Sequence, residues 1–198
     1  AREAWTRWKC EVVVDVIRQV RDACREIKPD VQVMLNTLPF GAAEFDGARE
    51  KVFGQWIEAL TGVVDVFEVM TYHQILKRPT GWIPQAGLEV KQRSGRKTVC
   101  TIQARPLYLD GIHARSNRSL AFDEKEFAQA VDAVENSDLD GLVVFVEADR
   151  VGGPATALAD LDGDGDLDGI CCGGSGQSQS NTTPSVFHLA LNLGAETF

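Results

Sequence analysis

Apolar residues along the chain follow two alternating patterns. In four segments they recur every three to four positions, the spacing of one helix face, which predicts helices over residues 8–27, 48–62, 81–95 and 122–137. Between these segments lie short, continuous apolar runs, which predict buried strands over residues 31–40, 63–74, 97–109 and 140–148. Helix and strand therefore alternate through the first three quarters of the chain.

Local signals refine the predicted helices. Pro29 ends the first, Gly62 closes the second and Pro84 should break the third. Asp123 and Glu126 have the spacing of a capping box at the start of the fourth. In the first helix the apolar stripe that should face the core comprises Val12, Val13, Val16, Ile17, Val20, Cys24 and Ile27.

Helix–strand units in series predict an α/β fold with a parallel sheet and helices outside it. Half of an eight-stranded (β/α)8 barrel and a doubly wound open sheet both fit this order. No glycine-rich loop follows a predicted strand, which disfavours a nucleotide-binding open sheet. A complete barrel needs about 250 residues, so we expect residues 1–150 to form a partial barrel of four helix–strand units.

Three of the strand segments resemble known proteins. "VQVMLNTLPF", "GVVDVFEVMTYHQIL" and "DGLVVFVEA" look like the later strands of glycoside-hydrolase-like barrels, and the likeness covers residues 5–149. The resemblance implies that this region is the C-terminal half of such a barrel, whose first strands are not in this chain. It further implies a fragment of an exported carbohydrate-active protein that acts on glycosidic bonds and is incomplete by itself.

Candidate site residues follow from the rule that barrel chemistry lies at the carboxyl ends of the strands. Glycoside hydrolysis needs two carboxyl groups beside the scissile bond, and Glu147 and Glu68 are the inward-facing carboxylates that strand alternation predicts. An alternative is that Glu68 pairs with Arg105 inside the barrel and has only a structural role. The expected substrate-binding residues are Asn36, Tyr72, His73, Gln103 and Arg105.

Charge and composition change near residue 150. The net charge is −9, yet residues 151–198 hold six acidic residues and no Lys or Arg, which predicts a second domain over residues 151–198. An acidic chain without a basic stripe excludes typical nucleic-acid binding, and no apolar run is long enough to predict a membrane span. Five cysteines fit neither a zinc site nor a disulfide framework, so Cys10, Cys24 and Cys100 are expected to be buried apolar residues.

Aspartates in the second domain stand at every second position. They are Asp160, Asp162, Asp164, Asp166 and Asp168. Side chains at positions one, three, five and nine, with Gly165 at position six, suit the oxygen-rich shell of Ca²⁺ better than the stricter shell of Mg²⁺. Position twelve, where an EF-hand needs an acidic residue, is Cys171. The alternatives to a calcium loop are a magnesium site and a solvated acidic turn.

The aspartate run also resembles a repeat family. "TALADLDGDGDLDGICCG" followed by "SVFHLALNLGAETF" is similar to FG-GAP/VCBS repeats, with Asn192, Gly194 and Phe198 at the family's last places. This implies a small β calcium-binding unit of propeller-blade type and an extracellular or cell-surface location, with further repeats or the missing barrel half as partners. The alternative function is a non-catalytic extracellular module that binds calcium and mediates adhesion or binds carbohydrate.

Overall fold

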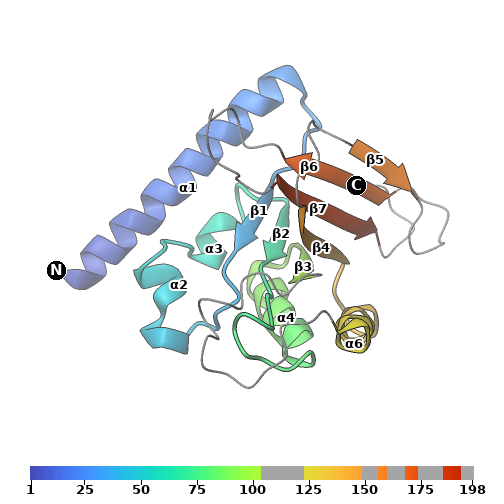
Figure 1. Ribbon diagram of the computed structural model, residues 1–198. Coiled ribbons are helices and arrows are strands. Elements are labelled where there is room, and N and C mark those ends of the chain that lie inside the picture. The colour runs from blue at the N-terminus through green and yellow to red at the C-terminus, as the bar shows by residue number, and fades with distance from the viewer. Residues whose placement is uncertain (104–122, 149–155, 160–167, 174–184, 193–198) are drawn as a thin grey trace, which may run out of the picture. The chain divides into compact units, whose positions relative to one another are not determined.

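The computed structural model describes residues 1–103, 123–148, 156–159, 168–173 and 185–192, with side chains as far as Phe145 (Figure 1). Contacts between Cα atoms divide the chain into two units. The first comprises Ala1–Thr71 and Gln85–Val99, and the second comprises Tyr72–Pro84 and Cys100–Phe198. The predicted domain boundary near residue 150 stays a prediction.

Seven strands form one sheet in the order β1-β2-β3-β4-β7-β6-β5. Strands β1 to β4 are parallel and β5 to β7 pair antiparallel, which confirms the predicted α/β class with a four-stranded parallel sheet. Closure into a barrel stays a prediction. The strands are β1 (Met34–Thr37), β2 (Val66–Val69), β3 (Lys97–Gln103), β4 (Gly141–Ala148), β5 (Thr156–Ala159), β6 (Asp168–Gly173) and β7 (Ser185–Asn192).

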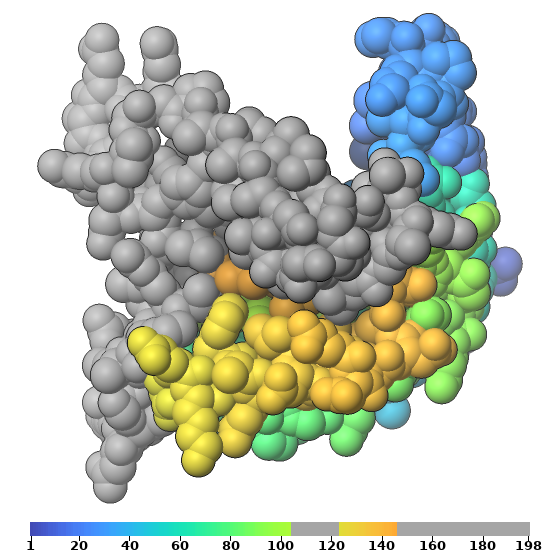
Figure 2. All heavy atoms as spheres, turned by 90° about the vertical axis from the view of Figure 1, so that its right-hand side faces the viewer, coloured from blue at the N-terminus to red at the C-terminus, as the bar shows by residue number. Residues whose placement is uncertain are grey.

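Helix α6 (Glu124–Glu135) belongs to the second unit and packs beside β4, as the yellow and orange atoms of Figure 2 show. Asp123 is its N-cap, as the sequence predicted, and its carboxylate accepts hydrogen bonds from the backbone N–H groups of Lys125 and Glu126. Ala130 and Val134, one turn apart, are buried. One apolar face of the helix is therefore buried, and the Asp123 cap fixes its first turn.

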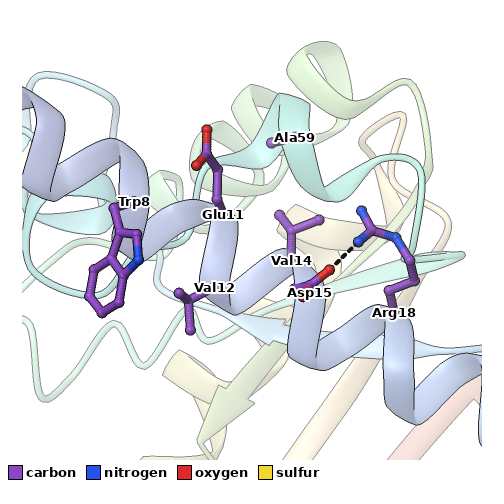
Figure 3. Close-up of a pocket in the computed structure, with 7 residues that line it drawn as sticks. All are labelled: Trp8, Glu11, Val12, Val14, Asp15, Arg18 and Ala59. Atoms are coloured by element: carbon purple, nitrogen blue, oxygen red, sulfur yellow. Dashed lines mark hydrogen bonds and ion pairs between the residues drawn. The ribbon is translucent and has the colours of Figure 1, made fainter.

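Helix α1 (Arg2–Ile27) belongs to the first unit and contacts α2 (Ala48–Lys51) and α3 (Ile57–Leu60). The predicted core stripe is wrong, because within α1 only Cys10 and Val14 are buried. Figure 3 shows Val14 pointing toward the side of Ala59 and Trp8 pointing away. The apolar residues of α1 that are 41–89% exposed are Trp5, Trp8, Val12, Val16, Val20 and Ile27.

The three cysteines whose side chains the structure describes differ in burial. Cys10 and Cys100 are buried as expected, whereas the expectation for Cys24 is wrong, because this residue is exposed near the end of α1.

The single helix predicted over residues 48–62 is wrong, since α2 and α3 are separate. Gly54 lies between them with φ +70°, and a Cβ atom there would lie 3.0 Å from Cγ2 of Val13 and 3.3 Å from the carbonyl oxygen of Lys9. The next side chain, Gln55, accepts hydrogen bonds from Thr37 Oγ1 (3.1 Å) and Leu38 N (2.9 Å). Close approach to α1 and attachment to the end of β1 therefore interrupt the helix.

Helix α4 (Trp82–Ser94) is continuous, so the predicted break at Pro84 is wrong. Pro84 lies in the first turn, where a backbone N–H has no partner inside the helix and proline is tolerated. Gly95 follows the helix with φ +62°, and its N–H donates to the carbonyl oxygen of Lys91 at 2.8 Å. Glycine ends the helix here in the left-handed conformation that favours this residue.

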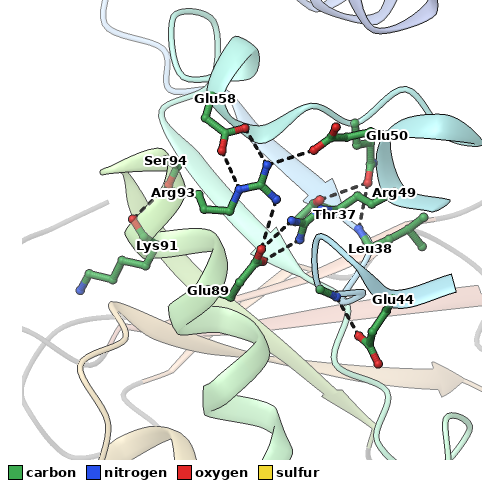
Figure 4. A network of polar contacts seen from close by, with 12 residues as sticks. Thr37, Leu38, Glu44, Arg49, Glu50, Glu58, Glu89, Lys91, Arg93 and Ser94 are labelled. Carbon is green, nitrogen blue, oxygen red and sulfur yellow. Dashed lines mark hydrogen bonds and ion pairs between the residues drawn. The ribbon is translucent and has the colours of Figure 1, made fainter. Parts of the chain in front are cut away.

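Two arginines and three glutamates form a polar network inside the first unit (Figure 4). Arg49 is 1% exposed and donates from Nη1 and Nη2 to the two oxygens of Glu89, both at 2.9 Å. Arg93 donates to Glu58 at 2.6 Å, Glu50 at 3.0 Å and Glu89 at 3.1 Å. Through these contacts α4 is joined to α2 and α3 by charged hydrogen bonds.

Candidate functional site

Polar side chains gather at the carboxyl end of β3 in the second unit. His73 and Gln74 come from the segment that follows β2 in the chain, Gln103 is the last residue of β3, and Glu126 lies in the first turn of α6. His73, Gln74 and Gln103 are 1%, 8% and 3% exposed. We call these four residues the β3-end cluster.

Direct contacts hold the β3-end cluster together. Nε2 of His73 lies 3.3 Å from Oε1 of Glu126, and Nε2 of Gln74 donates to Oε2 of the same carboxylate at 3.2 Å. Oε1 of Gln103 accepts a hydrogen bond from the backbone N–H of Ile75 at 3.4 Å. The carboxylate of Glu126 is therefore oriented by two side chains, and the segment that carries them is tied to the end of β3.

Local backbone bonds explain why two successive side chains of this segment reach the same carboxylate. The N–H of Arg78 donates to the carbonyl of His73 at 2.8 Å, and the N–H of Lys77 donates to the carbonyl of Gln74 at 3.1 Å. Lys77 itself has φ +55°. The chain thus turns sharply after Gln74, which fixes both side chains in one place.

An aromatic contact lies at the start of the same segment. The rings of Tyr72 and Phe145, which lies in β4, have centroids 5.3 Å apart and are inclined by 40°. Tyr72 is half-buried, so its ring packs on one side while part of the residue stays accessible. Three of the predicted substrate-binding residues, Tyr72, His73 and Gln103, therefore lie within the second unit.

Chemically, the β3-end cluster offers hydrogen-bond donors and acceptors whose positions are fixed before a ligand arrives. The side chain of Glu126 is 24% exposed and is the most accessible member. Its carboxylate can accept hydrogen bonds from hydroxyl groups, while the buried amides of Gln74 and Gln103 hold Glu126 and the backbone of Ile75 in place. Such a set suits a ligand rich in hydroxyl groups.

Asn36 and the candidate catalytic carboxylate Glu68 lie in the first unit. They stand opposite each other in the parallel register of β1 and β2, so their side chains share one face of the sheet. Asn36 is exposed, whereas Glu68 is 3% exposed. The second candidate carboxylate, Glu147, lies in β4 opposite Val186, and its side chain falls outside the described residues, as does Arg105.

Most of the aspartate run also lies outside the described residues, namely Asp160, Asp162, Asp164 and Asp166. The strands on either side are described. β5 ends at Ala159, β6 begins at Asp168, and these two residues are register partners in an antiparallel pair. Among the described residues no group of three or more His, Cys, Asp or Glu side chains could hold a metal ion.

Sequence reasoning identified Glu126 only as part of a capping box. In the structure its carboxylate contacts His73 and Gln74. A signal was present, because an acidic residue in the first turn of a helix that follows a predicted strand lies near the carboxyl edge of the sheet. Gln74 follows His73 directly and could have been included on the same ground.

No family model, curated protein or solved structure matches the chain. Among the described helices, none combines the length and the apolar composition that crossing a bilayer requires.

Proposed function

We propose that the chain is a carbohydrate-binding part of a glycoside-hydrolase-like α/β protein. The observation that carries the proposal is the β3-end cluster, in which the buried side chains of His73 and Gln74 contact the accessible carboxylate of Glu126 and the buried Gln103 binds the same segment at Ile75. The cluster lies at the carboxyl end of a parallel strand, where α/β folds bind their ligands. The resemblance of the strand segments to glycosidase-like barrels supports the same function.

Sugar binding is favoured by donors and acceptors that are already ordered in the free protein, because ordering side chains on binding costs affinity. The contacts of Glu126 with His73 and Gln74 supply this order in advance. Tyr72, which precedes His73 in the chain, is half-buried and adds an aromatic ring that packs on Phe145. We propose that hydroxyl groups of the sugar bind to the carboxylate of Glu126 and that its apolar face packs against the ring of Tyr72.

Hydrolysis is the activity that we propose for the intact protein, with Glu147 and Glu68 as the catalytic pair. A glycosidase needs two carboxyl groups roughly 5–10 Å apart, one on each side of the bond that it cleaves. The proposal predicts that Glu147→Gln and Glu68→Gln each remove hydrolysis of oligosaccharides while binding persists. Hydrolysis that survives in both variants would exclude this pair.

Binding is tested by titrating the full chain with neutral gluco-, xylo-, manno- and chito-oligosaccharides and measuring heat and amide chemical shifts. Gln103→Ala and Glu126→Gln should each weaken binding at least tenfold, which corresponds to about 1.4 kcal/mol. Glu124→Gln is the matched control, since Glu124 lies in the same turn and is exposed. Equal affinity in all three variants would overturn the assignment of the site.

Calcium binding by residues 160–168 is the second proposed function. Its support is the aspartate spacing together with the pairing of Ala159 with Asp168, which brings the two ends of the run together between antiparallel strands. Strands rather than helices on both sides agree with the resemblance to FG-GAP/VCBS repeats and disfavour an EF-hand. An extracellular location, where Ca²⁺ reaches millimolar concentration, belongs to the same proposal.

A further inference from the structure

A pocket of about 720 Å³ lies in the first unit between the amino-terminal part of α1 and the residues that follow β1. It is lined by Arg2, Glu3, Trp5, Thr6, Arg7, Cys10, Asp46, Glu50, Lys51 and Trp56. We call it the α1 pocket. It is larger than the hollow of about 540 Å³ beside Trp8 in Figure 3, and it is lined by two tryptophans instead of one.

Aromatic surface is the first property that limits what the α1 pocket can bind. Trp5 is 59% exposed although it is large and apolar, and its ring stacks on Trp8 with centroids 4.8 Å apart and planes inclined by 27°. Trp56 has the guanidinium of Arg7 at 6.0 Å from its ring centroid. Both rings are therefore held by neighbours, so a ligand that packs on them does not have to order them.

Charge is the second property. The lining contains three cationic side chains (Arg2, Arg7 and Lys51) and three anionic ones (Glu3, Asp46 and Glu50), so the α1 pocket carries no formal net charge. Nζ of Lys51 contacts Oδ1 of Asp46 at 2.9 Å. A balanced set disfavours phosphate and polycations, which need an excess of one sign. It provides many donors and acceptors for neutral hydroxyl groups.

Backbone conformation is the third property. Phe45, Asp46 and Gly47 are consecutive residues with φ of +49°, +57° and +73°. Two of them are not glycine, and residues in this left-handed region are strained and concentrate at ligand-binding sites. The strained turn belongs to the segment that follows the carboxyl end of β1 and carries Asp46, one of the lining residues.

We infer that the α1 pocket binds a neutral sugar unit, with the apolar ring face on Trp5 and Trp56 and the hydroxyl groups on Asp46 and Lys51. A pyranose has an apolar face and a polar edge. Aromatic rings suit the apolar face, and the paired charged groups beside them suit the hydroxyl groups of the edge. The inference rests on the proposed carbohydrate function and adds a second binding site, built from the first unit. The exposed valines of α1 farther along the helix, Val16 and Val20, do not line this pocket.

The test is a titration of the full chain with a neutral oligosaccharide series, followed by amide and indole chemical shifts. Trp5→Ala should weaken binding at least tenfold, and Trp5→Phe should keep most of it. Asp46→Asn should weaken binding severalfold; asparagine tolerates the left-handed backbone as aspartate does, so folding is preserved. Phe53→Ala is the matched control, because Phe53 is 50% exposed in the same unit and does not line the pocket.

The outcomes separate this inference from the proposed function. Shifts at Trp5 and Trp56 that disappear in Trp5→Ala support the α1 pocket. Shifts confined to Gln103 and Glu126 overturn binding at the α1 pocket and support binding at the β3-end cluster. Shifts confined to Trp5 and Trp56 overturn binding at the β3-end cluster and support binding at the α1 pocket. No shift with any oligosaccharide at millimolar concentration overturns both. A change of oligomeric state in Trp5→Ala without a change in sugar binding identifies the surface as a protein contact and also overturns the inference.

Discussion

Arg49 and Glu89 form a two-pronged ion pair in the first unit, with both N–O distances at 2.9 Å and the arginine 1% exposed. Its partner carboxylate is 30% exposed, so the pair is buried on the arginine side and open on the glutamate side. Removal of the glutamate charge therefore leaves a buried guanidinium without its counter-charge, which is costlier than the loss of a surface pair.

Glu89→Gln is accordingly expected to lower the free energy of unfolding by about 3 kcal/mol. Glu11→Gln is the control; it removes the Arg7–Glu11 pair, whose side chains are 71% and 62% exposed, and should cost less than about 1 kcal/mol. Urea denaturation followed by circular dichroism measures both. Equal costs for the two variants would contradict the importance of the Arg49 pair.

Acid should weaken the same network. Burial raises the pKa of Glu89 and of Glu58, but hydrogen bonds from Arg49 to Glu89 and from Arg93 to Glu58 outweigh it and hold both pKa values below the ordinary 4.5. Carboxyl groups with a depressed pKa stabilise the fold fully above 4.5, and this stability is lost as the pH falls through their folded-state values.

In thermal melting between pH 7 and pH 3, these groups should leave the Tm unchanged down to about pH 5. Below about pH 4.5 they should lower the Tm. Glu89→Gln should lose less Tm than the wild type over the acidic part of this range, since one of the titrating groups is absent. An identical acid-induced decrease in both proteins would show that other carboxylates are responsible.

Gly54→Ala should destabilise the first unit by about 2 kcal/mol, because alanine is strained at positive φ and its methyl group meets the α1 backbone. The φ of Gly54 is +70°, and the nearest atoms to a new Cβ would be Cγ2 of Val13 at 3.0 Å, Cγ of Lys9 at 3.2 Å and the carbonyl oxygen of Lys9 at 3.3 Å. Gly62→Ala is the control, since a Cβ there meets nothing within 4 Å. Equal unfolding midpoints for the two variants would disprove the close contact.

Asp123→Ala should cost about 1 kcal/mol and loosen the first turn of α6. The carboxylate of Asp123 accepts from the N–H of Lys125 at 3.0 Å and from the N–H of Glu126 at 3.2 Å. Hydrogen exchange of these amides should accelerate in Asp123→Ala and stay slow in Asp123→Ser, which keeps a capping oxygen. Since Glu126 belongs to the β3-end cluster, Asp123→Ala should also weaken the binding of sugar there.

Calcium should stabilise the chain if the aspartate run binds it. Calcium at 100 times its dissociation constant adds about 2.7 kcal/mol to the free energy of unfolding of the part that binds it. Asp164→Asn should reduce the increase in Tm, and Asp22→Asn, an exposed change on α1, should not. The absence of any Tm shift at millimolar Ca²⁺ would disprove the metal assignment, and an equal shift with Mg²⁺ would contradict selectivity for calcium.

Local chain chemistry determined a large part of the fold. The alternation of helices and strands up to β4, the parallel class of the first four strands and the N-cap at Asp123 follow from periodicity and capping, which depend on residues a few positions apart. Among the five predicted substrate-binding residues, the proximity of Gln103 to the segment that carries His73 follows from the rule that strand ends meet at one edge of a sheet. The predicted calcium site likewise depends only on the spacing of the aspartates in residues 160–168 of the sequence.

Tertiary contacts decided the rest. Helix α1 has apolar residues on more than one face, so periodicity could not choose between Val14, which is buried, and Val16, which is exposed. Gly54 interrupts a helix because α1 approaches it, and Glu126 turns toward His73 because the chain after β2 brings an imidazole to the start of α6. Each depends on residues distant in sequence, and their packing is a free-energy balance that no local pattern contains.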